Sequence, residues 1–161
     1  MAEGEFALMQ NHVMAALAKC PPEAPGGRED LYVMLADSAA QQRAQAELQK
    51  YAPLAEETAR RIDHKLYMAV AHRAWGVAHT LAAEYPQAEA RLQQALEIFA
   101  GYPAPWQVGR SLFDMGELAR AQGNRELARS HFSGALEAFE GLRAAPFAAG
   151  ARAALQSLGP A

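Results

Sequence analysis

Strand-forming runs, cysteine and an excess of one charge are what this 161-residue sequence has least of. No run rich in Val, Ile and Thr occurs, which argues against a β-sheet core. The single cysteine, Cys20, excludes an internal disulfide framework and is typical of a reducing compartment. The net charge of −3 lacks the clustered basic excess of a nucleic-acid-binding surface.

Targeting and membrane-spanning segments are also missing from the sequence. The first residues, MAEGEF, are acidic and lead into no long apolar run, so no signal peptide is expected. No stretch approaches the roughly 18 uninterrupted apolar residues of a membrane span. We therefore expect a cytoplasmic protein with neither a membrane nor a nucleic acid as its partner.

Alanine is abundant, at 38 of the 161 residues, whereas aromatic residues make up only 8%. This usage is typical of a helical protein whose helices approach one another closely. The length predicts one domain, 1–161, that is large enough to bury a real core.

A repeat of 40 residues organises the sequence. Segments 75–99 and 115–139 agree at six of 25 positions, and small residues at Ala36 and Ala55 extend the same register toward the N-terminus. The recurring glycines, Gly76 and Gly116, indicate positions where two helices come closest.

Proline and glycine divide the chain into about eight predicted helices. These span about 5–20, 29–45, 47–62, 65–83, 86–100, 106–122, 125–140 and 146–158. Paired by the repeat, they give an N-terminal half-repeat helix (5–20), a divergent repeat (29–62), two further repeats (65–100 and 104–140) and a C-terminal capping helix (146–158). A helix pair this short cannot bury its apolar face alone, so the pairs must stack.

The pattern resembles the tetratricopeptide repeat. The small and aromatic positions that resemble it are Gly76, Ala88, Ala95, Gly116, Ala128, Phe132 and Ala135. Tyr85 lies where that family favours an aromatic residue, and Gly123 where it favours a turn glycine. The period of 40 is similar to the longer-helix variety of bacterial regulators. The resemblance implies an all-α, right-handed α-solenoid of antiparallel helix pairs that binds proteins without catalysis.

In that family the first helix of each pair lines the concave face. Carried over by register, the expected partner-binding residues are Val33, Asp37, Val70, Arg73, Val77, Arg110, Phe113, Glu117 and Arg120. Apolar side chains at the centre, acidic groups toward one end and arginines toward the other suit a peptide segment or an amphipathic helix of a partner. The Lys/Asn arrangement that clamps a terminal carboxylate in some members is absent, which argues against capture of a C-terminus.

No constellation typical of catalysis or metal binding is found. His72 and His79 lie two helical turns apart, roughly 10 Å along the axis, which is too far for one zinc ion. Asp114 and Glu117 are close enough to interact, and we expect a solvated acidic pair. No glycine-rich phosphate loop is present. We therefore expect no enzyme activity, no metal and no cofactor.

Two alternatives to an interaction module stay open. The first is a small-effector sensor of a bacterial transcriptional regulator, which binds its effector on the concave face or in a pocket near Trp75, His79 and Trp106. The second is a homo-oligomerisation domain, because the first and last helices lack an outer neighbour and each should leave an apolar flank. The expected flank residues are Phe6, Met9, Val13, Phe147, Leu155 and Leu158.

Overall fold

The computed structural model of the chain describes residues 3–19 and 27–159. These residues form eight α-helices and no strand. The helices are α1 (Glu3–Lys19), α2 (Gly27–Gln42), α3 (Gln45–Arg61), α4 (Lys65–Leu81), α5 (Tyr85–Ala100), α6 (Pro105–Ala121), α7 (Arg125–Gly141) and α8 (Ala145–Ser157). The predictions for Cys20 and for the side chains of Phe6 and Met9 lie outside the described residues.

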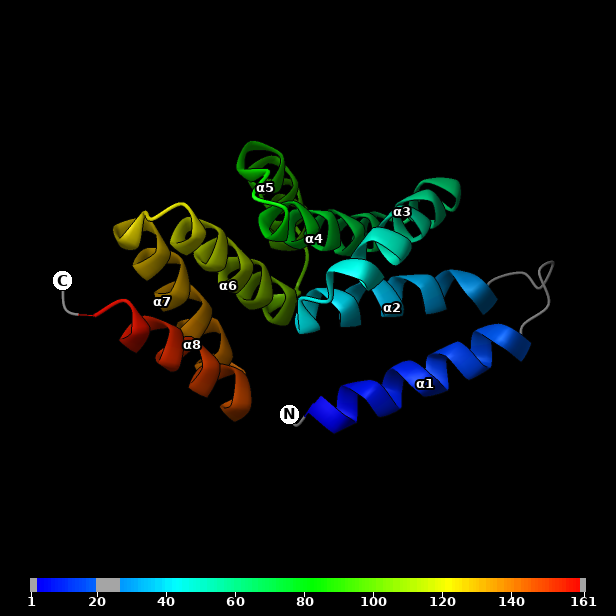
Figure 1. Cartoon of the computed structure of the whole chain (residues 1–161), viewed down its shortest axis with the longest axis horizontal. Coiled ribbons are helices and arrows are strands. Elements are labelled where there is room, and N and C mark those ends of the chain that lie inside the picture. Colours follow the sequence, from blue (N-terminus) through cyan, green and yellow to red (C-terminus); the bar gives the residue numbers. More distant parts are fainter. Residues whose placement is uncertain (1–2, 20–26, 160–161) are drawn as a thin grey trace.

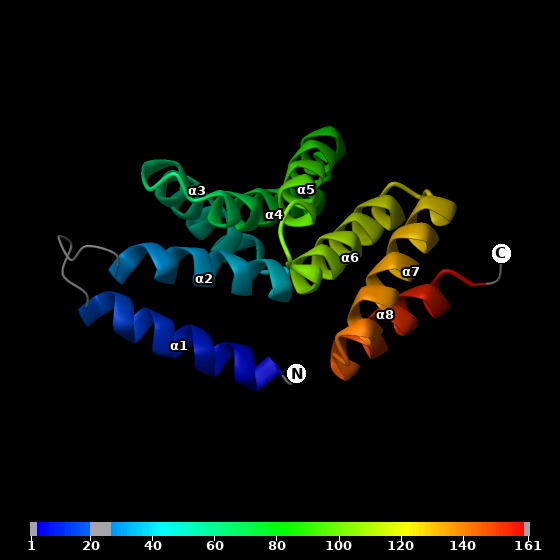
Figure 2. The same ribbon diagram turned by 180° about the vertical axis from the view of Figure 1, so that it is seen from behind.

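The helices follow one another as stacked hairpins (Figure 1). Each helix packs on its chain neighbours, while α2 also packs on α4 and α4 on α6. The view from behind shows the same succession, with α1 beside α2 at one end and α8 beside α7 at the other (Figure 2). The predicted all-α class and the eight helices are confirmed, and the arrangement is that of a helical solenoid.

The helix ends recur every 20 residues, at half the sequence repeat. Five turns contain a residue with positive φ, namely Arg43, Asp63, Ala83, Gly123 and Arg143. After each of them, the next backbone N–H donates to the carbonyl five residues back, as in the 3.0 Å bond from Ala44 to Ala39, which closes the last turn of the helix. The helices predicted to end at 45 and 83 therefore end at Gln42 and Leu81. Pro103 cannot adopt positive φ, and the turn there differs.

The glycines of the repeat lie where paired helices are closest, as predicted. A Cβ added at Gly76 would lie 2.5 Å from Cγ of Leu92, and one at Gly116 would lie 2.5 Å from Cδ1 of Phe132. Both partner side chains are fully buried. Each glycine therefore lets one large side chain of the second helix lie against the backbone of the first.

The four described residues of the apolar flanks expected at the terminal helices are buried or half-buried, which corrects the prediction for them. Val13 of α1 is buried in the core formed with α2 and α3, and Leu158 is buried in a cluster that includes Phe132. Phe147 and Leu155 are half-buried against α6 and α7. The outer helices cover these side chains because they rotate their apolar faces onto the neighbouring hairpin. None of the described helices is long and apolar enough to span a membrane.

Candidate functional site

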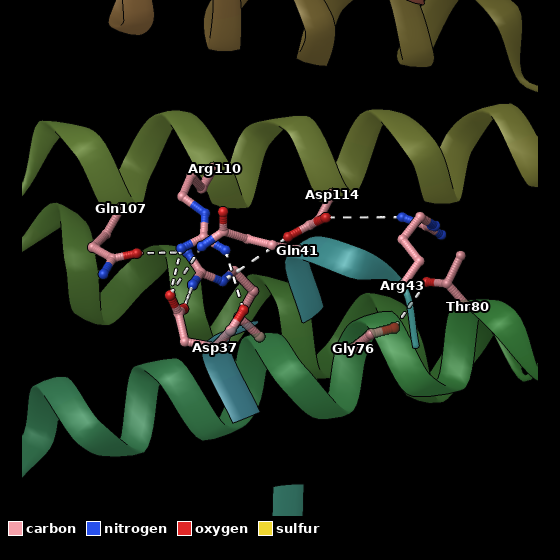
Figure 3. Close-up of polar contacts among 9 residues, drawn as sticks. Asp37, Gln41, Arg43, Gly76, Thr80, Gln107, Arg110 and Asp114 are labelled. Atoms are coloured by element: carbon pink, nitrogen blue, oxygen red, sulfur yellow. Dashed lines mark hydrogen bonds and ion pairs between the residues drawn. The ribbon is translucent and has the colours of Figure 1, made fainter. Parts of the chain in front are cut away.

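Side chains from α2, α4 and α6 meet in a buried polar network, which we call the charged bridge (Asp37, Arg73, Gln107 and Arg110). Arg73 is fully buried and donates to Oδ1 of Asp37 and, over 2.6 Å, to Oε1 of Gln107. Arg110 donates over 2.7 Å to Oδ2 of the same aspartate (Figure 3). One carboxylate from α2 thereby joins two guanidinium groups from the next two hairpins.

A second carboxylate, that of Asp114, lies beside the charged bridge. Its oxygens lie 4.0 Å from Nε of Arg73 and 3.9 Å from Nη1 of Arg43, and its side chain is only 12% exposed. Burial raises its pKa, although the nearby guanidinium groups oppose that shift. Glu117, one turn further on, is nearly buried and pairs over 2.5 Å with Arg120. The expected solvated acidic pair is therefore wrong, because α6 turns both carboxylates toward arginines.

Burial also shifts the arginines of the charged bridge. It lowers the pKa of Arg110 to about 10, and Asp114 opposes the shift. It lowers the pKa of Arg73 well below its ordinary value, and the like charge of Arg110 adds to the effect. The guanidinium of Arg73 also lies 5.8 Å from the ring centre of Phe99. The acidic and basic ends expected for the concave face therefore meet in one network of paired charges.

A largely apolar cavity of about 280 Å³ lies on one side of the bridge, and we call it the N-terminal cavity. Residues that line it include Val33, Met34, Asp37, Leu66, Val70, Phe99 and Gln107. Met34 at the rim of this cavity is 45% exposed. The cavity thus combines an apolar wall with one accessible flexible side chain.

A second cavity, the C-terminal cavity, has a volume of about 220 Å³ and a more mixed lining. Residues that line it include Gln41, Arg43, Arg110, Phe113, Asp114, Phe147 and Gly150. The fully buried Phe139 forms its back wall, with its ring centre 5.5 Å from that of Phe147. This cavity lies between the end of α2, the middle of α6 and the start of α8.

Five of the nine residues predicted to bind a partner line one of the two cavities. Val33, Asp37 and Val70 line the N-terminal cavity, while Arg110 and Phe113 line the C-terminal one. That they contact a partner stays a prediction.

The other four predicted residues line neither cavity. Arg73 and Val77 are 0% and 1% exposed because α4 is enclosed by α2, α3, α5 and α6. These two side chains are buried under the inner face. This corrects the expectation that they lie at the contact surface. Glu117 is nearly buried, and Arg120 is exposed beside it.

The two tryptophans that were expected to share a pocket with His79 pack against different hydrophobic clusters. Trp75 stacks on His79 with ring centres 5.5 Å apart, and its indole N–H donates over 2.8 Å to Glu56. Trp106 instead packs edge-on against Phe147, at 4.5 Å between ring centres. Sequence spacing placed both tryptophans on first helices of their pairs, but it did not show that they face different clusters.

Several residues that line the cavities were missed by the sequence interpretation, among them Arg43 and Phe147. Arg43 was placed inside a helix, whereas it occupies the left-handed turn after α2 and so reaches Asp114. Phe147 was assigned to an outer flank, although it lines the C-terminal cavity. The recurrence of turn residues every 20 positions is the signal that could have found Arg43. Among the described residues, no group of three or more His, Cys, Asp or Glu side chains could hold a metal ion.

Stacked antiparallel helix pairs, two of which have a close glycine contact, define a helical repeat protein. The tetratricopeptide repeat family matches residues 67–141, which run from α4 to the end of α7. The chain therefore contains tetratricopeptide repeats in that segment. Repeats of this family generally mediate protein–protein interactions and are generally non-catalytic. Comparison with curated proteins found no match.

Proposed function

We propose that the inner face formed by α2, α4 and α6 is a non-catalytic binding surface for a peptide segment or an amphipathic helix of a partner protein. The observation that supports this most is the pair of cavities, each of which is lined by residues of the charged bridge. Binding energy at protein interfaces is concentrated in a few side chains that fill such pockets. Two pockets on one face therefore suit two anchors of one segment.

The charged bridge supplies polar groups between those two anchor sites. Asp37 remains 24% exposed although it accepts from two arginines, so its oxygens are within reach of a donor from a bound segment. The bridge also ties three helices together, which keeps the cavities formed before binding. A preformed site reduces the ordering cost that binding must overcome.

Size favours side-chain anchors over a whole effector. Small-molecule sites usually occupy about 300–1,000 Å³, and each cavity here is smaller than that range. The sensor hypothesis is therefore the weaker of the two. The cytoplasmic location, the bacterial origin and self-association stay predictions from the sequence.

The test is selection of peptides from a displayed random library against the full chain, followed by calorimetric affinities. Met34→Glu places a charge at the rim of the N-terminal cavity and should weaken selected peptides at least tenfold. Leu127→Glu is the matched control, because Leu127 is 40% exposed on a helix and lines neither cavity. Peptides that bind the Met34→Glu variant as tightly as the wild type would place the interface elsewhere.

A further inference from the structure

The C-terminal cavity contains a carboxylate that accepts no hydrogen bond from the described residues. Asp114 interacts with Arg43 and Arg73 only at 3.9 and 4.0 Å, beyond hydrogen-bonding distance. Gln41, which also lines this cavity, donates from its Nε2 to Asp37. This orientation of the amide leaves its Oε1 buried and without a hydrogen-bond partner. Buried acceptors without a donor are costly, so the cavity favours a group that brings one.

Charge restricts that donor to a neutral group. A cationic side chain in the cavity would meet the guanidinium groups of Arg43 and Arg110. A carboxylate would meet the carboxylate of Asp114, with Glu117 one turn further along α6. Like charges at such distances in a half-buried site are strongly unfavourable. A neutral N–H or O–H group avoids both conflicts and can donate to Asp114.

The rest of the cavity is aromatic. Phe113 and Phe147 are both half-buried at its walls, with Phe139 behind them. Aromatic rings pack well against one another in tilted or edge-on arrangements, as Trp106 and Phe147 already do here. The volume of about 220 Å³ suits one aromatic side chain.

We infer that the C-terminal cavity receives a tryptophan or tyrosine side chain of the partner segment. Its ring packs between Phe113 and Phe147, and its N–H or O–H donates to the carboxylate of Asp114. This inference rests on the proposed function, since it specifies one anchor of the segment bound on the inner face.

Indole and 1-methylindole are the probes for a test that needs no partner. They share the ring system, but only indole has a donor. Binding to the isotope-labelled full chain is followed by amide chemical shifts in nuclear magnetic resonance. We expect saturable millimolar binding of indole with shifts around Asp114 and Gly150, and about tenfold weaker binding of 1-methylindole.

Gly150→Leu is the variant that fills the cavity without disturbing the fold. A Cβ at Gly150 meets no atom within 4 Å, and the residue lines the cavity from α8. Gly141→Leu is the matched control, because Gly141 is equally open but lies outside both cavities. Indole binding should be lost in the first variant and kept in the second, with helicity unchanged in both.

Three results would overturn the inference: no saturable indole binding up to its solubility, equal binding of 1-methylindole, or indole binding that survives Gly150→Leu. None of these results contradicts the proposed function if the selected peptides still bind the Met34→Glu variant more weakly than the wild type. If selected peptides depend on neither Met34 nor Gly150, the proposed function fails as well. Selected peptides that lose affinity when their tryptophan or tyrosine becomes phenylalanine would support the inference directly.

Discussion

Gly116→Ala should destabilise the protein even though alanine is the better helix former. The added Cβ would lie 2.5 and 2.6 Å from two ring atoms of Phe132, which is fully buried and cannot swing away. Overpacking of a dense core costs about 1–3 kcal/mol, occasionally more. The gain in helix propensity from glycine to alanine is about 1 kcal/mol. We therefore expect a net loss of up to about 2 kcal/mol in the free energy of unfolding.

The assay is urea unfolding followed by circular dichroism, arranged as a double-mutant cycle with Phe132→Ala. That second change alone should cost about 3–5 kcal/mol, since it removes a fully buried ring. It also removes the atoms that the new Cβ meets, so Gly116→Ala should become neutral or stabilising in its presence. If Phe132→Ala leaves too little folded protein, Gly76→Ala with Leu92→Ala makes the same test in the preceding repeat.

Gly150→Ala is the control for this cycle, because its Cβ meets no atom within 4 Å. It should raise the free energy of unfolding by up to about 1 kcal/mol. The reasoning would be refuted if Gly116→Ala were as stabilising as the control, or if its cost were the same with and without the Phe132 ring.

Three further predictions concern charge, turns and pH. Arg73→Met should lower the free energy of unfolding by about 3 kcal/mol in urea titrations, because it leaves buried carboxylate charge with less compensation. Ala83→Gly should raise the melting temperature, corresponding to up to about 1 kcal/mol, since φ at Ala83 is 58°. Burial lowers the pKa of His72 and of His131, so their stabilising neutral form is lost as the pH falls below about 6.5. Stability measured against pH should decline there, and replacing both histidines by glutamine should flatten the decline.

The fold was largely predictable because the same packing contact in each repeat requires the same type of residue at a fixed spacing in the sequence. Gly76 and Gly116 stand 40 residues apart, and each meets the equivalent large residue, Leu92 or Phe132, of its second helix. Helix ends were less predictable, since four of the left-handed turn residues are not glycine. Arginine and alanine adopt positive φ at these turn positions because the surrounding hairpin imposes that backbone conformation. Their local sequence contains no signal that predicts it.

The candidate site was predicted only in part, for a different reason. Register shows which residues face the inner surface, and Val33, Val70 and Phe113, which it selected as partner-binding residues, line the cavities. Register does not show how far each of these side chains is buried. Arg73 faces the same way but is enclosed by its neighbours, so exposure depends on the curvature of the whole array, which no single repeat encodes.

The charged bridge joins α2 directly to α6 on the inner face. Asp37 and Arg110 lie 73 residues apart, on helices separated by a whole hairpin, and they meet directly. Burying such charges gives little net stability compared with an apolar core of the same volume. Their geometric effect is more specific, because a carboxylate with two guanidinium partners fixes the approach of α2 to α6. Since both cavities are bounded by members of this network, the contact that joins α2 to α6 also helps to fix the shape of the two candidate anchor sites.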